Sequence, residues 1–179
     1  IVVTITGNTD SRPYSGAEQS VTGYTVSTSN PLYTETDFTF TVTATAKGTD
    51  ADSYAMGLTP EQFENTNPNF ENVTFIVTDG KLTITPRSVK LTSVKAEKVY
   101  DGTPLTKHEA GVTEGSTVDG ESFVYEFTGT LTVAGESANS FIIRAGHGTH
   151  LAHYDITQQA RTLHVATNGT VPGQATWTQ

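Results

Sequence analysis

Hydrophobic and polar residues alternate along several stretches of this chain. The stretch FTFTVTA has Phe38, Phe40, Val42 and Ala44 at every second position, with threonines between them. The stretch FVYEF, which begins at Phe123, repeats the pattern. A period of two places successive side chains on opposite faces of a β-strand. The pattern therefore predicts strands with one buried face and one solvated face.

The connections between these strands carry turn signals and one helix signal. In VTFIVTDGKLTIT, Asp79 and Gly80 separate two apolar runs, which predicts a β-hairpin with a tight turn. In residues 58–67, Thr59 is suited to an N-cap and Pro60 to the first helical position. We predict one short helix there, of one to two turns, with no equivalent in the second half of the chain.

The chain contains an internal repeat. RPYSGAEQSVTGYTV corresponds to KVYDGTPLTKHEAGV, which aligns Tyr14 with Tyr100. TDFTFTVTATAKGTDADSY corresponds to ESFVYEFTGTLTVAGESANSF, which aligns Tyr54 with Phe141. NFENVT and KLTIT correspond to HYDIT and TLHVA in the same order. A repeat of this length indicates one structural unit present twice.

We therefore predict a mainly β protein with two tandem small modules, residues 1–86 and 87–167. Residues 168–179 are then a polar tail or the start of a following module. Pro86 stands between two predicted strands without a Gly/Ser linker, which predicts a stiff junction. An Ig-like sandwich and a β-grasp fold both fit, and a helix packed across a sheet would indicate the second.

Aromatic residues at matched positions of the two copies are expected to form the cores. These residues are Tyr14, Tyr100, Phe38, Phe123, Tyr54, Phe141, Phe70 and Tyr154.

Composition narrows the classes of function. Nucleic acids and anionic membranes are negatively charged and attract positively charged proteins. The net charge of −9 therefore argues against both as partners. There is no apolar run long enough to span a bilayer and there is no cysteine, so we expect no membrane insertion and no disulfides. We expect a monomer without a cofactor.

The stretch AGHGTHLAHYD, residues 145–155, is the strongest candidate for chemistry. Its HGTH motif resembles the catalytic histidine block of subtilisin-like proteases, but the sequence lacks their DTG and GTSMA blocks. Three imidazoles, His147, His150 and His153, would suit zinc. Steps of three do not keep them on one face of a helix or strand, and the flanking glycines indicate a loop. We therefore predict no metal site and keep these residues as weak candidates.

Two further acidic or amide motifs have structural interpretations. Asp50 and Asp52 form part of a calcium-loop pattern, but the second copy has Asn139 opposite Asp52, which favours turn capping. Asn72 and Asn168 begin glycosylation sequons that we attribute to chance.

An intramolecular isopeptide bond would need a buried lysine beside an asparagine and an acid. The first copy has only Lys47 and Lys81, and both fall at turn or solvent positions. We therefore do not predict such a bond.

The motifs KVYDGTPLT, GTLTVAGESANSF and HYDIT…TLHV resemble the MBG-type repeats of large bacterial surface proteins. The resemblance covers nearly the whole chain apart from its tail. It implies β-rich extracellular modules in a stalk that displays an adhesive or catalytic head. Two departures are Ser15 in place of the usual Asp, and Gln159-Ala160-Arg161 in place of the usual Asn-Gly turn.

The leading expectation is a non-catalytic stalk segment of a bacterial cell-surface adhesin-like protein, located outside the cell and flanked by further repeats. The alternative is an adhesive module that binds a host glycan or protein. An edge strand could capture a peptide, and Tyr24 or Tyr33 could stack on a sugar. A contiguous exposed aromatic patch would favour this alternative.

Overall fold

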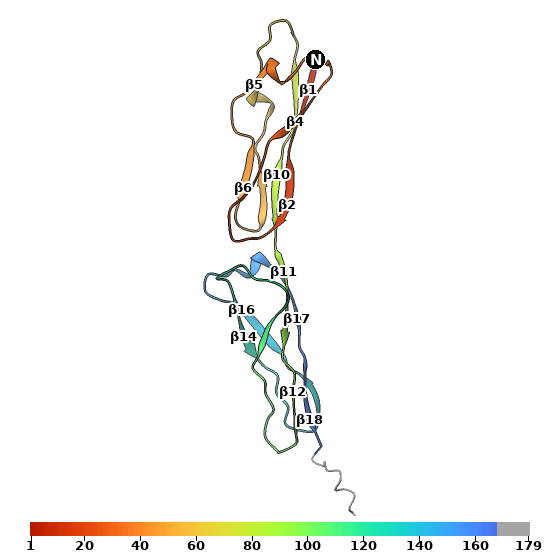
Figure 1. The fold of residues 1–179 in the computed structure, drawn as a ribbon, viewed down its shortest axis with the longest axis vertical. Helices are drawn as coiled ribbons and strands as arrows, with labels where there is room; N and C mark the ends of the chain where they lie inside the picture. The colour runs from red at the N-terminus through yellow and green to blue at the C-terminus, as the bar shows by residue number, and fades with distance from the viewer. Residues whose placement is uncertain (168–179) are drawn as a thin grey trace, which may run out of the picture. The chain divides into compact units, whose positions relative to one another are not determined.

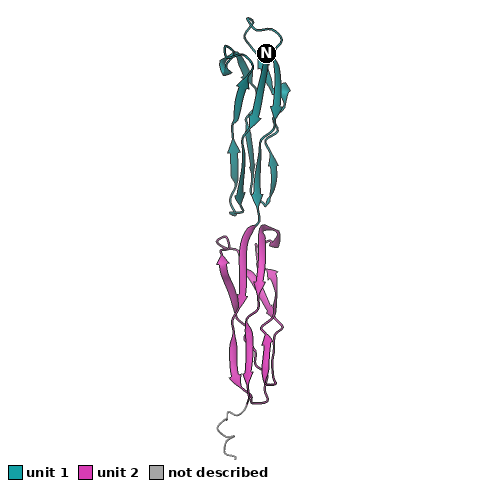
Figure 2. Cartoon of the chain, turned by 90° about the vertical axis from the view of Figure 1, so that its right-hand side faces the viewer, with its two compact units in different colours: residues 1–86 teal, residues 87–179 magenta. Residues whose placement is uncertain are grey.

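The computed structural model describes residues 1–167 and divides into two compact units. The first unit runs from Ile1 to Pro86 and the second begins at Arg87 (Figure 2). Strands dominate both units, which confirms the predicted mainly β class. No helix within the described residues has the length and apolar character needed to cross a membrane.

Figure 1 shows the strands and labels those for which there is room. The first unit contains β1 (Val2–Gly7), β2 (Thr9–Pro13), β3 (Gln19–Thr22), β4 (Tyr24–Thr28), β5 (Phe38–Phe40), β6 (Thr45–Gly48), β7 (Asp52–Ala55), β8 (Phe63–Asn65), β9 (Thr74–Thr78) and β10 (Lys81–Thr85). The second contains β11 (Arg87–Ser93), β12 (Ala96–Val99), β13 (Ala110–Gly115), β14 (Phe123–Phe127), β15 (Gly135–Ala138), β16 (Phe141–Ala145), β17 (Tyr154–Gln159) and β18 (Thr162–Ala166). The three short 3-10 helices are η1 (Glu35–Asp37), η2 (Pro60–Gln62) and η3 (Leu151–His153).

The two units share one pairing scheme. In the first unit the sheets have the strand orders β4-β1-β9 and β2-β10-β7, and β5 pairs with β8. In the second the orders are β13-β11-β17 and β12-β18-β15, and β14 pairs with β16. The β3–β6 pair of the first unit is reduced in the second to a single bridge between Leu105 and Leu131. Since no helix within residues 1–167 is laid across a sheet, the arrangement is sandwich-like.

In each unit the N-terminal strands run parallel to the C-terminal strands. β1 pairs with β9 from Val2–Thr74 to Thr6–Thr78, and β2 continues the ladder with β10. β11 pairs with β17 and β12 pairs with β18 in the same way. The first and last segments of each unit therefore form one interrupted parallel ladder.

The predicted hairpin at Asp79 and Gly80 is wrong. β9 and β10 do not pair with each other, because β9 pairs with β1 and β10 pairs with β2. Neither residue at the proposed turn has a positive φ. Instead, the Asp79 carboxylate accepts the backbone N–H groups of Gly57 at 3.0 Å and Leu58 at 2.8 Å. The aspartate therefore fixes a neighbouring segment rather than reversing the chain.

The helix predicted in residues 58–67 is limited to the three residues of η2. The Thr59 N–H donates to Oε1 of Gln62 at 3.0 Å, so the expected N-terminal signal is used. The helix ends at Gln62, because Phe63 begins β8 and pairs with β5. The prediction of a helix in this segment alone is also wrong, since η1 lies in the first unit and η3 in the second.

The cores follow the alternation of the strands that pair most extensively. Val3 and Ile5 of β1 and Leu82 and Ile84 of β10 are buried in the first unit. The equivalent residues of the second unit are Val89, Leu91, Leu163 and Val165, and they are also buried. The alternation predicted from Phe38 stops early, because β5 ends at Phe40 and Val42 is 48% exposed.

Most of the predicted aromatic core is correct. Tyr14, Phe38, Phe123, Phe141 and Tyr154 are buried. Tyr54 and Phe70 are partly buried.

Tyr100 is the exception, because its side chain is 41% exposed while that of Tyr14 is 5% exposed. The backbone is held alike at both sites, since Tyr14 N–H donates to Thr85 O and Tyr100 N–H to Ala166 O. After Tyr100, Asp101 bonds to Lys98 and Thr103 in a polar turn that does not cover the ring.

Because Tyr100 is exposed, Tyr100→Ala should lower the free energy of unfolding of the second unit by less than about 1 kcal/mol. Tyr14→Ala, at the equivalent buried site, should cost the first unit about 2–3 kcal/mol. Chemical denaturation followed by NMR signals from each unit measures both effects. A larger loss of stability for Tyr100→Ala than for Tyr14→Ala would contradict the assignment of Tyr14 as buried and Tyr100 as exposed.

Candidate functional site

The histidine-rich stretch joins β16 to β17. His147 and His150 are exposed, whereas His153 is buried in η3. The rings of His150 and His153 meet edge to face with centroids 5.4 Å apart. Among residues 1–167, no three side chains of His, Asp, Glu or Cys gather closely enough to hold a metal. The structure therefore does not assemble the three candidates into one site.

Backbone contacts and a threonine fix this connection. Gly146 N–H donates to Ser122 O at 2.9 Å, and Ser122 N–H donates to Oγ1 of the buried Thr149 at 2.9 Å. Gly148 has a φ of 76°, a region that favours glycine. The HGTH motif is thus explained by a turn.

Of the calcium-loop candidates of the first unit, Asp50 lies in the bend before β7 and Asp52 is the first residue of that strand. The Asp52 carboxylate accepts its neighbour's N–H, that of Ser53, at 2.7 Å. Tyr54 Oη donates to the backbone carbonyl of Asp50 at 2.8 Å. These local bonds are typical of capping.

Asn139 does not match Asp52, and turn capping is the wrong role for it. Its side chain is 0% exposed, and Nδ2 donates to Val94 O and Lys107 O, both at 2.8 Å. Asn139 N–H donates to Arg161 O, as Met56 N–H donates to Gly80 O in the first unit. Asn139 therefore occupies the position of Met56 and joins segments distant in the sequence.

The aligned pair Tyr54 and Phe141 also requires correction. Tyr54 lies opposite Leu82, whereas Ser137 lies opposite the equivalent Leu163. Phe141 faces Phe127, and its counterpart Phe63 faces Phe40. The residues between β7 and β8, including η2, are an insertion in the first unit. The alignment of the two copies did not recognise this insertion and therefore paired the wrong residues.

The remaining candidates lie at the surface. Lys47 and Lys81 are exposed, as predicted. Asn72 is exposed with a φ of 55°, and Asn168 lies outside the described residues.

The two tyrosines proposed to stack on a sugar differ in exposure. Tyr33 is 2% exposed, and its hydroxyl donates to Oδ1 of Asn65 at 2.9 Å. Tyr24 packs edge-on against Phe40 and Phe63, with both centroid distances 5.4 Å. Tyr33 therefore belongs to the core of the first unit and cannot stack on a sugar, whereas Tyr24 is half-buried.

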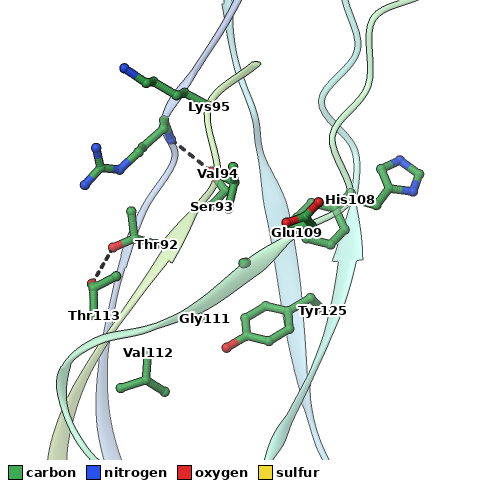
Figure 3. A pocket seen from close by; sticks show the side chains of 13 residues that line it. Thr92, Ser93, Val94, Lys95, His108, Glu109, Gly111, Val112, Thr113 and Tyr125 are labelled. Atoms are coloured by element: carbon green, nitrogen blue, oxygen red, sulfur yellow. Dashed lines mark hydrogen bonds between the residues drawn. The ribbon is translucent and has the colours of Figure 1, made fainter.

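The second unit instead contains an open groove of about 810 Å³ between the end of β11, β13 and β14 (Figure 3). We call it the β13 groove. Figure 3 shows Tyr125 beside Gly111 of β13. The aromatic and charged residues that line it are Lys95, His108, Glu109, Tyr125, Phe127 and Arg161.

The groove exists because one aromatic residue of the first unit has no counterpart in the second. Ala110 pairs with Ser93 of β11 as Tyr24 pairs with Gly7 of β1. The next bonds agree, since Val94 N–H donates to Glu109 O at 2.9 Å and Asn8 N–H to Gly23 O at 3.0 Å. Where the first unit has a tyrosine ring against two phenylalanines, the second has a methyl group and open space.

Aromatic and charged groups share the groove. The His108 imidazole is stacked on Phe127, with centroids 5.2 Å apart and planes 5° from parallel. The Tyr125 hydroxyl is protonated at neutral pH, as in any tyrosine, and burial raises its pKa further. Glu109 is paired with Lys107 at 2.7 Å. The groove can therefore offer flat apolar surface, a hydroxyl donor and cations.

Residue-by-residue reasoning missed this groove, because no single lining residue is unusual. The signal was nevertheless present in the internal repeat. The alignment that places Tyr14 over Tyr100 also places Tyr24 over Ala110. A large-to-small change at one position between two copies of a fold indicates a cavity in one of them.

Of the comparisons with known proteins, one found a match, and it covers the first unit. Residues 1–86 match the family model described as the MBG domain. No curated protein and no solved structure matches the chain significantly.

Proposed function

We propose that this chain is a structural segment of a surface-protein stalk, because residues 1–86 match the model of the MBG domain, a non-catalytic repeat family. The full proposal is a non-catalytic spacer in a bacterial cell-surface adhesin-like protein, located outside the cell. In it, each unit transmits tension between the cell and a distal head.

The observation that supports this proposal most strongly is the parallel pairing of the first and last segments of each unit. Ile1 stands at the beginning of the β1–β9 ladder, and Thr85 stands at the end of the β2–β10 ladder. Tension applied at the two ends of the unit pulls the paired segments past each other. The inter-strand hydrogen bonds are then stretched together rather than one after another.

The second unit has the same geometry. Arg87 begins the β11–β17 ladder, and Ala166 ends the β12–β18 ladder. Both units would therefore resist tension by the same route. Forced unfolding is governed by the unfolding rate, so a geometry that loads many bonds at once suits a protein under tension.

The proposal predicts that resistance depends on the direction of pulling. The chain has no cysteine, so introduced cysteines give unique attachment points. Pulling between Ile1→Cys and Pro86→Cys shears the ladder of the first unit. Pulling between Ile1→Cys and Val73→Cys opens it from one end, because Thr74 N–H donates to Ile1 O at this end.

Single-molecule force spectroscopy on the full chain should show a clearly higher unfolding force for the first pair of attachments. Unfolding rates in the absence of force provide the control, and they should be alike for the two cysteine variants. Equal forces for the two directions would overturn the mechanical part of the proposal.

A further inference from the structure

We infer that the β13 groove binds an extended peptide segment that presents one aromatic side chain between acidic residues. This binding role goes beyond the structural function proposed above. Three observations, taken in turn below, point to this occupant.

The first observation is the shape of the space. In the first unit, the ring of Tyr24 lies edge-on to Phe40 and Phe63, which face each other across the β5–β8 pair. In the second unit, Phe127 and Phe141 are paired in the same way and Ala110 takes the place of the tyrosine. The open groove beside Ala110 is lined by Tyr125 and by Phe127, on which His108 is stacked. Edge-to-face contacts between aromatic rings are favourable. The first unit thus shows which side chain fits the empty position.

The second observation is the free edge of β13. In the strand order β13-β11-β17, β13 pairs with β11 on one side and with no other strand in the described part of the chain. An exposed edge can accept an added strand through its backbone groups, with alternate side chains entering pockets. A segment added at β13 can direct an aromatic residue toward Tyr125 and Phe127.

The third observation is the charge of the groove. Lys95 and Arg161 line it, and within residues 1–167 neither side chain lies within ion-pair distance of a carboxylate. The one carboxylate that lines the groove belongs to Glu109, and it is paired with Lys107. On a chain of net charge −9, this groove offers two available cations. Acidic residues beside the aromatic one would complement them.

The probe is a short synthetic peptide with a tyrosine between two glutamates, titrated into the full chain. Isothermal titration calorimetry and NMR chemical shifts should show binding localised to β13 and β14. Replacing the tyrosine by alanine should weaken binding by at least roughly tenfold. Added salt should weaken the tyrosine peptide's binding, since screening acts on exposed charges.

Protein variants separate the aromatic and charged contributions. Ala110→Tyr restores the residue of the first unit and should fill the groove, with a loss of at least roughly tenfold in affinity. Val124→Tyr adds the same ring on the exposed face of β14 and should bind the peptide as the unmodified chain does. Lys95→Gln combined with Arg161→Gln should weaken binding and reduce its dependence on salt.

Several results would overturn the inference. These are absence of binding, equal affinity for the tyrosine and alanine peptides, or unchanged affinity in Ala110→Tyr. If Ala110→Tyr fails to fold, the double glutamine variant decides. Unchanged affinity and unchanged salt dependence in that variant would overturn the inference. Binding of an acidic oligosaccharide at β13 and β14 without binding of the peptide would assign the groove to a glycan instead.

Discussion

Replacing Asn139 by aspartate should lower the free energy of unfolding of the second unit by about 4–5 kcal/mol at neutral pH. The side chain is fully buried, and its Nδ2 group donates to two backbone carbonyls. A carboxylate has the same shape but no hydrogen to donate. It would place a buried charge against the carbonyl oxygens of Val94 and Lys107, without the donors that a buried charge requires.

The effect should depend on pH in a defined direction. Burial and the neighbouring carbonyl oxygens favour the neutral acid, so the pKa of the introduced carboxyl is raised above its unfolded value of about 3.9. Below the unfolded pKa the protonated side chain can donate one hydrogen bond, and much of the lost stability returns. As pH rises from there toward the folded pKa, the unfolded state binds fewer protons than the folded state, and stability falls.

Chemical denaturation at several pH values, followed by NMR signals of the second unit, measures this loss. Ala138→Asp is the matched control, because the neighbouring residue of β15 is exposed. It should change stability by less than about 1 kcal/mol. A small effect for Asn139→Asp, or one that does not depend on pH, would show that the buried hydrogen bonds of Asn139 do not hold these distant segments together.

Gly80→Ala should destabilise the first unit by about 4 kcal/mol or prevent its folding. A Cβ atom on Gly80 would lie 2.4 Å from Asn8 O and 2.9 Å from the carbonyl carbon of Gly7. Both are backbone atoms at the point where the parallel ladder passes from one sheet to the other. They cannot rotate away as a flexible side chain does, so relief of the clash must separate the paired segments.

Hydrogen exchange should report this separation as loss of protection in β1, β2, β9 and β10. Gly111→Ala in the second unit is the control, since no atom lies within 4 Å of its ideal Cβ position. It should leave stability within about 0.5 kcal/mol of the original. Retained protection in the Gly80 variant would mean that the two segments are less closely packed than the structure shows.

The sequence predicted the strands of this fold better than their partners. Alternation located the buried faces around Phe38 and Phe123, because that signal is local. The hairpin at Asp79 failed because the partners of β9 and β10 are β1 and β2, which lie at the other end of the unit. A turn signal cannot reveal that an aspartate is occupied by the amides of a distant segment.

The candidate site was hidden for a related reason. Histidines attract attention as single residues, whereas the β13 groove results from the absence of a ring at Ala110. The exposure of Tyr100 could not be inferred either, because its backbone contacts match those of the buried Tyr14. For Tyr100 the decisive difference lies in what the surrounding segments supply, and only the folded arrangement contains that information.

The exchange of Met56 for Asn139 between the two units also bears on misfolding. Neighbouring domains with the same topology are at risk of exchanging strands during folding. If β7 took the place of β15, Met56 would leave Val94 O and Lys107 O without their donor. The second unit therefore penalises the strand of the first, which disfavours this exchange between two copies of one fold during folding.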